Sequence, residues 1–290
     1  MIQLFTFIGK CSYFVLLARQ RLVEAEMERH DRVIISDAAW AWEGLRRNRA
    51  YRNAWLRHTG AAPRICDGRA SLRYIRLDRP YLEAETFGLV AFADPDLPAS
   101  EVPVFWRPSL LRRTLAVSLT VKPKTDRNGF SLASLKCCPT VLDTVDGERH
   151  IRLGGYNFWI QMVSQDITQL DDDTSIEVNF TGTHHLPQRI SSVEQLFSLH
   201  RSEDGMPAPV KRPPNRDKLL EGLLAWDIYH GNNGVQGTLQ DVAIALFGAD
   251  RIADEWGYNR SLKDRAIRAR DRGQTFVQGG YYDLLRRASF

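Results

Sequence analysis

The sequence predicts an α+β protein in which an N-terminal helical and mixed region precedes a central antiparallel β-meander and a C-terminal helix-turn-helix-like helical domain. Three observations predict this class: helical patterning over 37–58, apolar residues at spacing two over 141–181, and successive helical segments after 216. Hydrophobic residues make up 43% of the 290 residues and charged residues 26%, which excludes a disordered chain.

Residues 1–36 are predicted to be an extension ahead of the first domain. The stretch Ile2–Ala18 is mostly apolar, but Lys10 interrupts it, no basic region precedes it and no small-residue cleavage site follows. It is also short for a membrane span. We therefore expect a buried or interfacial amphipathic segment, with a wrongly assigned upstream start codon as the alternative, and no membrane partner.

The range 37–125 is predicted to be the first domain, and it opens with a helical region over Asp37–His58 in which Asp37 is the expected N-cap. Five arginines lie mostly outside its apolar stripe: Arg46, Arg47, Arg49, Arg52 and Arg57. They predict either a surface for phosphate or an acidic partner, or a solvated face whose arginine stems cover the core. Strand patterns follow at Phe87–Phe92 and Thr114–Val121.

The range 126–205 is predicted to be a four-stranded antiparallel meander followed by a short helix. Asp146-Gly147 is a strong hairpin signal, Gly154-Gly155 is a weaker one, and the acidic triplet Asp171–Asp173 marks another reversal. Ser191 and Glu194 have the spacing of a capping box for a helix over 190–201. A segment rich in proline and charge then predicts a linker and a boundary near 205.

The range 206–290 is predicted to be a DNA-binding domain of helix-turn-helix type. A helix is expected over Arg216–His230, then one that begins at Thr238 with a capping box to Asp241. A short helical piece over Asp250–Trp256 follows, and Ser261 is the expected cap of a long helix that runs to about residue 276. This order of helices is typical of helix-turn-helix domains.

The last of these helices carries the predicted site. Ser261, Arg265, Arg268 and Arg272 follow one another at steps of four, three and four, which places three guanidinium groups on one outward face, with Lys263 beside it. A helix fits the major groove, and arginine pairs with guanine or phosphate, so double-stranded DNA is the predicted partner. The alternative is a solvated face on which Asp264 and Asp271 pair with the arginines.

Other chemistry finds no support in the sequence. The four cysteines form no C-x-x-C pair and are expected to be reduced, and the adjacent histidines His184 and His185 would point to opposite sides of a strand, a poor metal pair. We expect no metal, no cofactor and no catalysis. A net charge of +4 excludes a polycation but allows a local basic face.

Several stretches resemble a family of proteobacterial regulators. The segments 245–256 (ALFGADRIADEW), 261–273 (SLKDRAIRARDRG) and 279–286 (GGYYDLLR) resemble its C-terminal helix-turn-helix-variant domain, long catalogued as a domain of unknown function. The segments 42–55, 94–98 and 104–108 resemble the transcriptional-regulator-like domain that usually accompanies it. The loop Gly231–Gly234 is longer than the usual turn of this family.

This resemblance implies FseA-like activators and antiactivators of the transfer of integrative and conjugative elements, and it makes the helix from Ser261 the recognition helix. We therefore expect a DNA-binding transcriptional activator linked to mobile elements, cytoplasmic and associated with the nucleoid. The alternative is an antiactivator-type interaction module that binds another transcriptional regulator in place of DNA.

Overall fold

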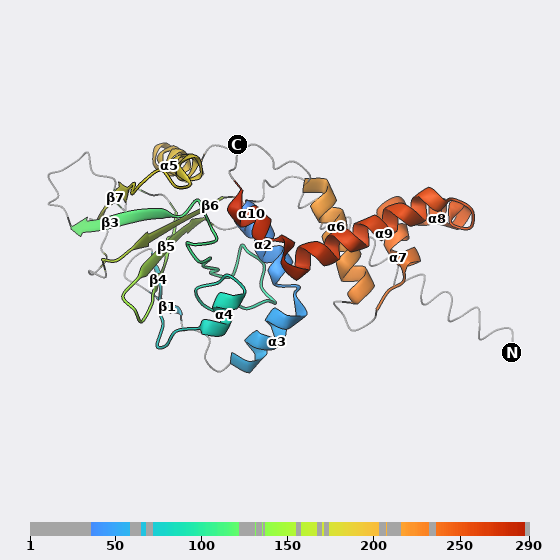
Figure 1. Cartoon of the computed structure of the whole chain (residues 1–290), viewed down its shortest axis with the longest axis horizontal. Coiled ribbons are helices and arrows are strands. Elements are labelled where there is room, and N and C mark those ends of the chain that lie inside the picture. The colour runs from blue at the N-terminus through green and yellow to red at the C-terminus, as the bar shows by residue number, and fades with distance from the viewer. Residues whose placement is uncertain are drawn as a thin grey trace. The chain divides into compact units, whose positions relative to one another are not determined.

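The computed structural model describes residues 36–58, 65–67, 72–121, 131, 135, 137–154, 158–166, 170, 174–202, 207, 216–231 and 236–287. Nearly all of the predicted extension 1–36 lies outside this part of the chain. The described residues fall into two compact units. One, the sheet unit, comprises 35–213 and 278–290, and the other, the helical unit, comprises the described residues within 214–277. The predicted α+β class is confirmed (Figure 1).

The described strands of the sheet unit form one seven-stranded sheet in the order β1-β2-β4-β5-β6-β3-β7 (Figure 1). Their bounds are β1 Ile65–Asp67, β2 Arg73–Arg76, β3 Leu115–Val121, β4 Thr140–Asp143, β5 Arg149–Gly154, β6 Trp159–Ser164 and β7 Thr174–Asn179. β4, β5 and β6 form the predicted antiparallel meander. The fourth strand departs from the prediction, because β3 lies between β6 and β7, parallel to β6 and antiparallel to β7.

The mixed sheet joins the two ranges that the sequence separates at 125/126. β2, from the first range, pairs in parallel with β4 from the second, and β3 pairs with β6 and β7. The hairpin predicted at Asp146-Gly147 connects β4 and β5, and Gly147 has φ +83°, but the turn is longer than the two-residue turn that this pair predicts, because the Thr144 amide donates to the Glu148 carbonyl across it. Strands on both sides of 125/126 therefore share one hydrogen-bonded sheet.

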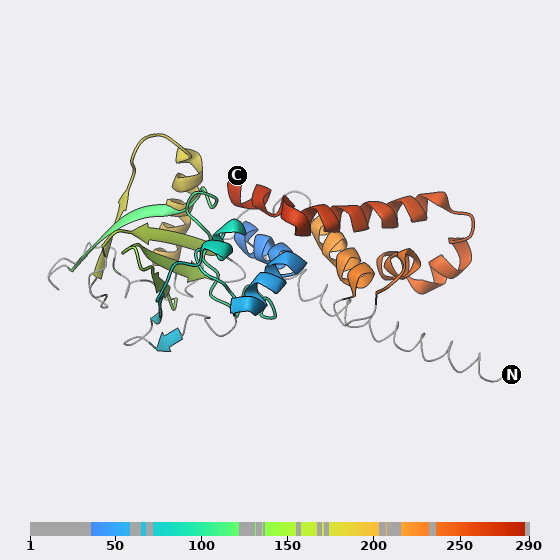
Figure 2. The same cartoon turned by 60° about the horizontal axis from the view of Figure 1, so that its bottom comes forward.

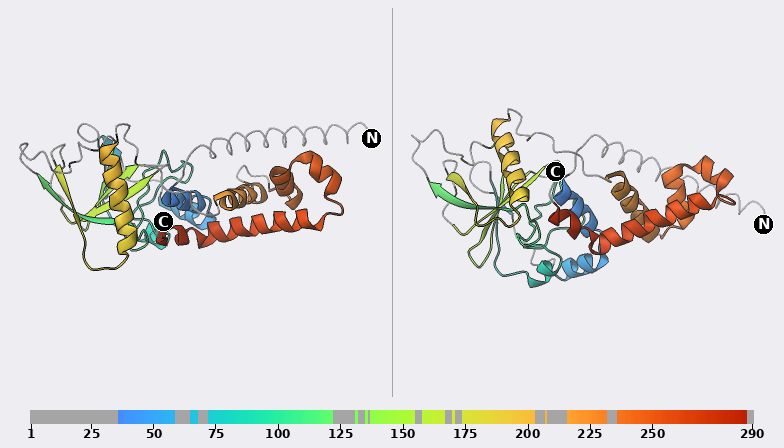
Figure 3. Two further views of the ribbon diagram at one scale, coloured as in Figure 1. Left: turned by 90° about the horizontal axis from the view of Figure 1, so that it is seen from above. Right: turned by 45° about the horizontal axis from the view of Figure 1, so that its top comes forward.

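Each face of the sheet is covered by other parts of the sheet unit. Helix α5 (Leu186–Arg201) lies against one face, where Leu196 and Leu199 join a core with the apolar side chains of β3–β7 (Figures 1 and 3). On the opposite face, the side chain of Gln161 exchanges hydrogen bonds with the backbone of Trp106, and Arg152 donates to the Val102 carbonyl. The segment 102–106 is thereby fixed to the sheet.

The predicted helical region over Asp37–His58 is not one continuous helix. It forms two helices, α2 (Asp37–Leu45) and α3 (Arg49–His58), because the Asn48 side chain accepts hydrogen bonds from the Ala50 and Tyr51 amides and starts a new helix. The N-cap of α2 is Ser36, and the residue predicted for this role, Asp37, is the first residue of the helix. A short helix, α4 (Leu82–Thr86), follows.

Two other predicted caps are also replaced. α5 starts at Leu186, with His185 as its N-cap, so Ser191 lies inside the helix rather than at its start. The helix predicted from Ser261 starts one residue earlier, at Arg260, because Asn259 accepts a hydrogen bond from the Leu262 amide. The predictions of both caps rest on residue type alone. In the structure, the position at which the preceding turn ends determines the residue that caps the helix.

The C-terminal end of the chain belongs to the sheet unit. Helix α10 (Tyr282–Arg286) packs against α2, and the Tyr281 ring lies 6.1 Å from the Trp106 ring. The Tyr281 hydroxyl donates to the Phe87 carbonyl and the Arg112 amide donates to the Leu285 carbonyl. Because Tyr281, Leu284 and Leu285 are all buried, this last helix is part of the core of the sheet unit.

The helical unit contains α6 (Arg216–His230), α7 (Leu239–Phe247), α8 (Ala249–Glu255) and α9 (Arg260–Thr275), and the π-helical segment η3 (Phe276–Gly280) follows α9. The predicted order of helices is confirmed. Val242, Ala243, Leu262, Ala266 and Ala269 are buried in its core, as their spacing predicts. The capping box between Thr238 and Asp241 is present. Of the loop Gly231–Gly234, only Gly231 lies within the described residues.

Helices α6 and α9 cross at two glycines (Figure 2). A methyl group on Gly222 would lie 3.1 Å from the Gly273 amide nitrogen, and one on Gly273 would lie 2.9 Å from the Gly222 carbonyl carbon and even closer to its oxygen. The obstacles are backbone atoms, which do not move aside as a flexible side chain does. The backbones of α6 and α9 therefore approach too closely for a side chain at position 273, and a side chain at position 222 would fit only if the helices shifted slightly.

We expect Gly273→Ala to destabilise the helical unit by about 2 kcal/mol, because overpacking at a backbone contact outweighs the gain in helix propensity. Amide hydrogen exchange would report it as lost protection in α6 and α9. Gly257→Ala is the matched control, since a methyl group there meets nothing within 4 Å. Equal protection in the two variants would contradict the tight crossing.

Candidate nucleic-acid interface

The charges of the helical unit are distributed unevenly among its helices. α9 contains six basic and two acidic residues, a formal net charge of +4, whereas α8 contains one arginine against three carboxylates. α6 and α7 each contain more acidic residues than lysines and arginines. A polyanion is therefore attracted to α9 and repelled by α8.

The packing of α9 determines which of its residues face solvent. Leu262, Ala266, Ala269 and Gly273 are buried on one side. Ser261, Arg265 and Arg268 are exposed on the other side, where the sequence predicts them. The structure thus brings three of the five predicted DNA-binding residues together on one exposed face.

Arg265 and Arg268 differ in how they are held. The Arg265 guanidinium carbon lies 4.5 Å from the centre of the Phe247 ring of α7, and this cation–π contact orients the side chain. Arg268 is exposed and forms no hydrogen bond or ion pair with any residue that the structure describes. The oriented guanidinium of Arg265 and the available guanidinium of Arg268 therefore lie about one helical turn apart on α9.

The other two predicted residues have partners within the unit. The Lys263 ammonium lies 5.6 Å from the centre of the Trp256 ring and donates to the Gly257 carbonyl at 3.4 Å. Arg272 forms an ion pair at 2.8 Å with Glu221 of α6. The predicted face of three guanidinium groups thus has two members, because Arg272 links α9 to α6 instead.

The sequence interpretation missed two exposed residues near the start of α9. Arg260 is the first residue of the helix and is exposed, and Tyr258 in the preceding turn is 78% exposed. The sequence pattern predicts Ser261 as the cap and so places Arg260 outside the helix, whereas Asn259 is the cap and Arg260 is the first helical residue. Asp264, half-buried, occupies the helical position between Arg260 and Arg268 and forms no ion pair with a described residue. The other acidic residue of α9, Asp271, pairs with its neighbour Arg270 at 2.8 Å.

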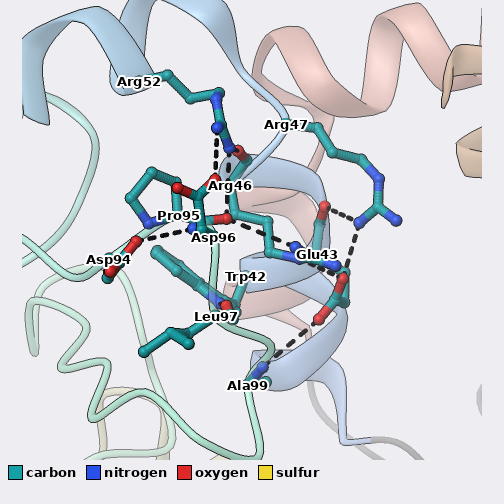
Figure 4. Close-up of polar contacts among 10 residues, drawn as sticks. All are labelled: Trp42, Glu43, Arg46, Arg47, Arg52, Asp94, Pro95, Asp96, Leu97 and Ala99. Carbon is teal, nitrogen blue, oxygen red and sulfur yellow. Dashed lines mark hydrogen bonds and ion pairs between the residues drawn. The ribbon is translucent and has the colours of Figure 1, made fainter. Parts of the chain in front are cut away.

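The arginines of the N-terminal helices surround a buried carboxylate (Figure 4). Arg46 Nε and Arg47 Nη1 lie 2.6 and 2.7 Å from Glu43 Oε2. Burial opposes the ionisation of Glu43, but the two guanidinium groups outweigh it and lower the pKa of the Glu43 carboxyl. We call these three residues the Glu43 triad.

Arg52 binds the loop that contains Pro95 and Asp96, next to the Glu43 triad (Figure 4). Its Nη2 lies 2.5 Å from Asp96 Oδ1, and its Nη1 donates to the Pro95 carbonyl at 3.4 Å. The Trp42 indole donates to the Leu97 carbonyl at 3.1 Å. Arg46, Arg47 and Arg52 therefore bind groups of the sheet unit, whereas Arg49, at the start of α3, is exposed. This arrangement favours the interpretation in which the predicted arginine surface stabilises the fold over the one in which it binds phosphate.

Neither a metal site nor a membrane span is found in the described part of the chain. No group of three or more His, Cys, Asp or Glu residues there could hold a metal ion. None of the helices there is long and apolar enough to cross a membrane. Burial together with the nearby Cys138 raises the pKa of Cys137 to about 11.

Comparison with known proteins gives one finding. Residues 173–286 match the family model described as the DNA-binding domain of a T6SS transcription factor, RovC. The match starts at β7 and includes α5 and all four helices of the helical unit. The match supports a DNA-binding domain of a transcriptional regulator in the C-terminal part of the chain. The matched family is a family of transcription factors, not a class of enzymes. No curated protein matches the chain.

We expect Glu43→Gln to lower the free energy of unfolding by about 3 kcal/mol, because it leaves two largely buried guanidinium groups without a counter-charge. Since the folded state lowers the pKa of Glu43, the carboxylate stabilises the fold above pH 4.5 and loses this effect as the pH falls through its lowered pKa. Urea unfolding followed by tryptophan fluorescence at pH 7 and pH 3 measures both effects.

Asp96→Asn is the control for this prediction. Asp96 is 65% exposed, so loss of its ion pair with Arg52 changes stability by less than about 1 kcal/mol. The stability difference between wild type and Glu43→Gln shrinks as the pH falls below 4.5 and through the lowered pKa of Glu43. A difference that stays constant with pH would show that the Glu43 charge plays no part.

Proposed function

We propose that the protein is a DNA-binding transcriptional regulator that contacts double-stranded DNA with the exposed face of α9. The observation that carries this proposal is the pair Arg265 and Arg268, exposed on the basic helix of the helical unit, within a range that matches a DNA-binding domain. Arginine side chains one turn apart can reach adjacent phosphates or the O6 and N7 atoms of guanine.

Charge also decides which helix approaches DNA. Gly248, with φ +88°, is the single residue between α7 and α8, a connection shorter than the usual turn of a helix-turn-helix element. In such an element the second helix usually enters the major groove. If α8 took that place, its Asp250, Asp254 and Glu255 would repel the phosphates. We therefore assign DNA contact to α9.

Distinct roles follow for the residues of this face. Arg268 is the best candidate for a base-edge contact, because its guanidinium is fully available. Arg265, held over Phe247, suits a phosphate whose position relative to the protein is fixed. Ser261 and Arg260, at the positive end of the helix, suit the neighbouring phosphate.

The finer functional assignments rest on the sequence resemblance alone. We propose that the protein activates transcription of genes linked to mobile or conjugative elements, that the range 37–125 acts as a regulator-like domain, and that the protein works at the nucleoid. The alternative is an antiactivator that binds another regulator. An antiactivator would form a stable complex with that regulator and would have no affinity of its own for DNA.

We expect Arg268→Ala to weaken binding to duplex DNA and to reduce the slope of log affinity against log salt by about 1 if Arg268 contacts phosphate. If it contacts a base, affinity falls by about 1–3 kcal/mol at the cognate site while the slope stays unchanged. Fluorescence anisotropy titrations of the full chain at several salt concentrations separate the two cases.

Arg251→Ala is the control, because Arg251 is an exposed arginine of α8 that pairs with Glu255 outside the proposed face. It should bind DNA as the wild type does. The proposal fails if the wild-type protein shows no salt-dependent DNA binding, or if Arg268→Ala and Arg251→Ala are equally affected.

We expect Asp264→Asn to tighten DNA binding, because it removes a negative charge that lies between Arg260 and Arg268 and has no described ion pair. The gain should be largest at low salt, where phosphate repulsion is least screened, and should disappear near 1 M salt. The same anisotropy titration measures it. Weaker binding by this variant would place the DNA on another face of α9.

A further inference from the structure

Four basic side chains gather where β7 leads into α5: Arg112, His184, His185 and Arg189, which we call the loop cluster. β7 ends at Asn179, and the next residues, from 180 to 184, are exposed. The sequence predicts that adjacent histidines on a strand point apart. They lie in a turn instead, and the centres of the His184 and His185 rings are 3.9 Å apart. The cluster belongs to the sheet unit.

The backbone at this turn adopts an unfavourable conformation. His185 has φ +55°, and no other non-glycine residue of the described chain has a positive φ. It is the N-cap of α5, yet its side chain accepts no hydrogen bond from the first turn of the helix. Left-handed backbone at a residue other than glycine is uncommon and often occurs at functional sites.

The charges of the loop cluster are uncompensated. None of its four side chains forms an ion pair with a carboxylate in the part of the chain that the structure describes. Arg189 Nε is buried and has no hydrogen-bond partner there. Partial burial, His184, Arg112 and Arg189 together lower the pKa of His185, which is the effect of a local positive potential. An anion bound at the cluster would relieve this repulsion.

Both the sequence match and the chemistry point to the same anion. The match to a DNA-binding domain starts at residue 173, so it includes His184, His185 and Arg189 although they lie outside the helical unit. The hydroxyl groups of Thr181 and Thr183 are exposed in the same turn and can donate to phosphate. Short polar and basic side chains are typical of contacts to the DNA backbone.

We propose that the loop cluster is a second DNA contact that binds the phosphate backbone, an inference that rests on the proposed function of α9. Such a contact adds affinity without reading sequence. It makes the sheet unit a direct participant in DNA binding rather than only a support for the helical unit.

The test compares variants of the full chain in anisotropy titrations against a duplex of random sequence and a duplex that contains the preferred site. Arg189→Gln should weaken binding to both duplexes by the same factor and reduce the salt slope by about 1. Arg201→Gln removes an equal charge from the far end of α5, where the arginine lies over Phe197, and should leave the slope unchanged.

A double variant, His184→Gln with His185→Asn, tests the imidazoles, and asparagine tolerates the left-handed conformation at 185. The charged groups around His185 are His184, Arg112 and Arg189. Because a bound phosphate would favour the charged form of His185, whose pKa the neighbouring positive groups lower, wild-type DNA binding should tighten as the pH falls below neutral and that of the double variant should tighten less. Thermal unfolding of each variant confirms that it is folded.

The outcomes distinguish this inference from the proposed function. If the wild type binds DNA and Arg268→Ala weakens it, while Arg189→Gln and the histidine variant keep the wild-type affinity, slope and pH dependence, the second contact is overturned and the proposed function stands. If Arg201→Gln changes the slope as much as Arg189→Gln does, the contact is a general charge effect and the inference also fails. Absence of wild-type DNA binding overturns both.

Discussion

The backbone contact between Gly222 and Gly273 determines the geometry of the helical unit. It fixes how closely α6 and α9 approach, and with the small side chains of Ala266 and Ala269 it fixes which side of α9 is buried. The exposure of Arg265 and Arg268 follows from that rotation. The ion pair between Arg272 and Glu221 lies beside the crossing and also stabilises this rotation of α9 about its axis. The basic residues of α9 form a defined surface only because the other side of the helix packs tightly against α6.

The sequence predicts features that depend on near neighbours. Thr238 and Asp241 form the expected capping box, and the apolar residues of α9 that recur every three or four positions are buried as expected, because helix packing follows local periodicity. The hairpin at Gly147 has the same local origin. These short-range signals suffice for the element order of the C-terminal part and for the exposed residues Ser261, Arg265 and Arg268.

Features that depend on distant partners are not predictable in this way. The place of β3 between β6 and β7 depends on pairs such as Leu115 with Met162 and Ala116 with Asn179, far apart in the sequence, which no local alternation encodes. Arg46 and Arg272 look alike in the sequence, exposed on amphipathic helices, until Glu43 and Glu221 are placed beside them. Arginine is ambiguous for this reason: the same side chain serves a buried ion pair or an external phosphate, and the difference lies in what folds against it.

The path of the chain has a consequence for how the two units can be separated. The chain leaves the sheet unit near residue 213, forms the helical unit and returns at 278, so the helical unit is an insertion with two covalent connections. A single cut upstream of the helical unit would also remove Tyr281, Leu284 and Leu285 and leave Trp106 without its ring partner. The sheet unit is thus complete only once residues 281–285 have been made, after every residue of the helical unit. In a growing chain, α6 to α9 are therefore synthesised before the core of the sheet unit is complete.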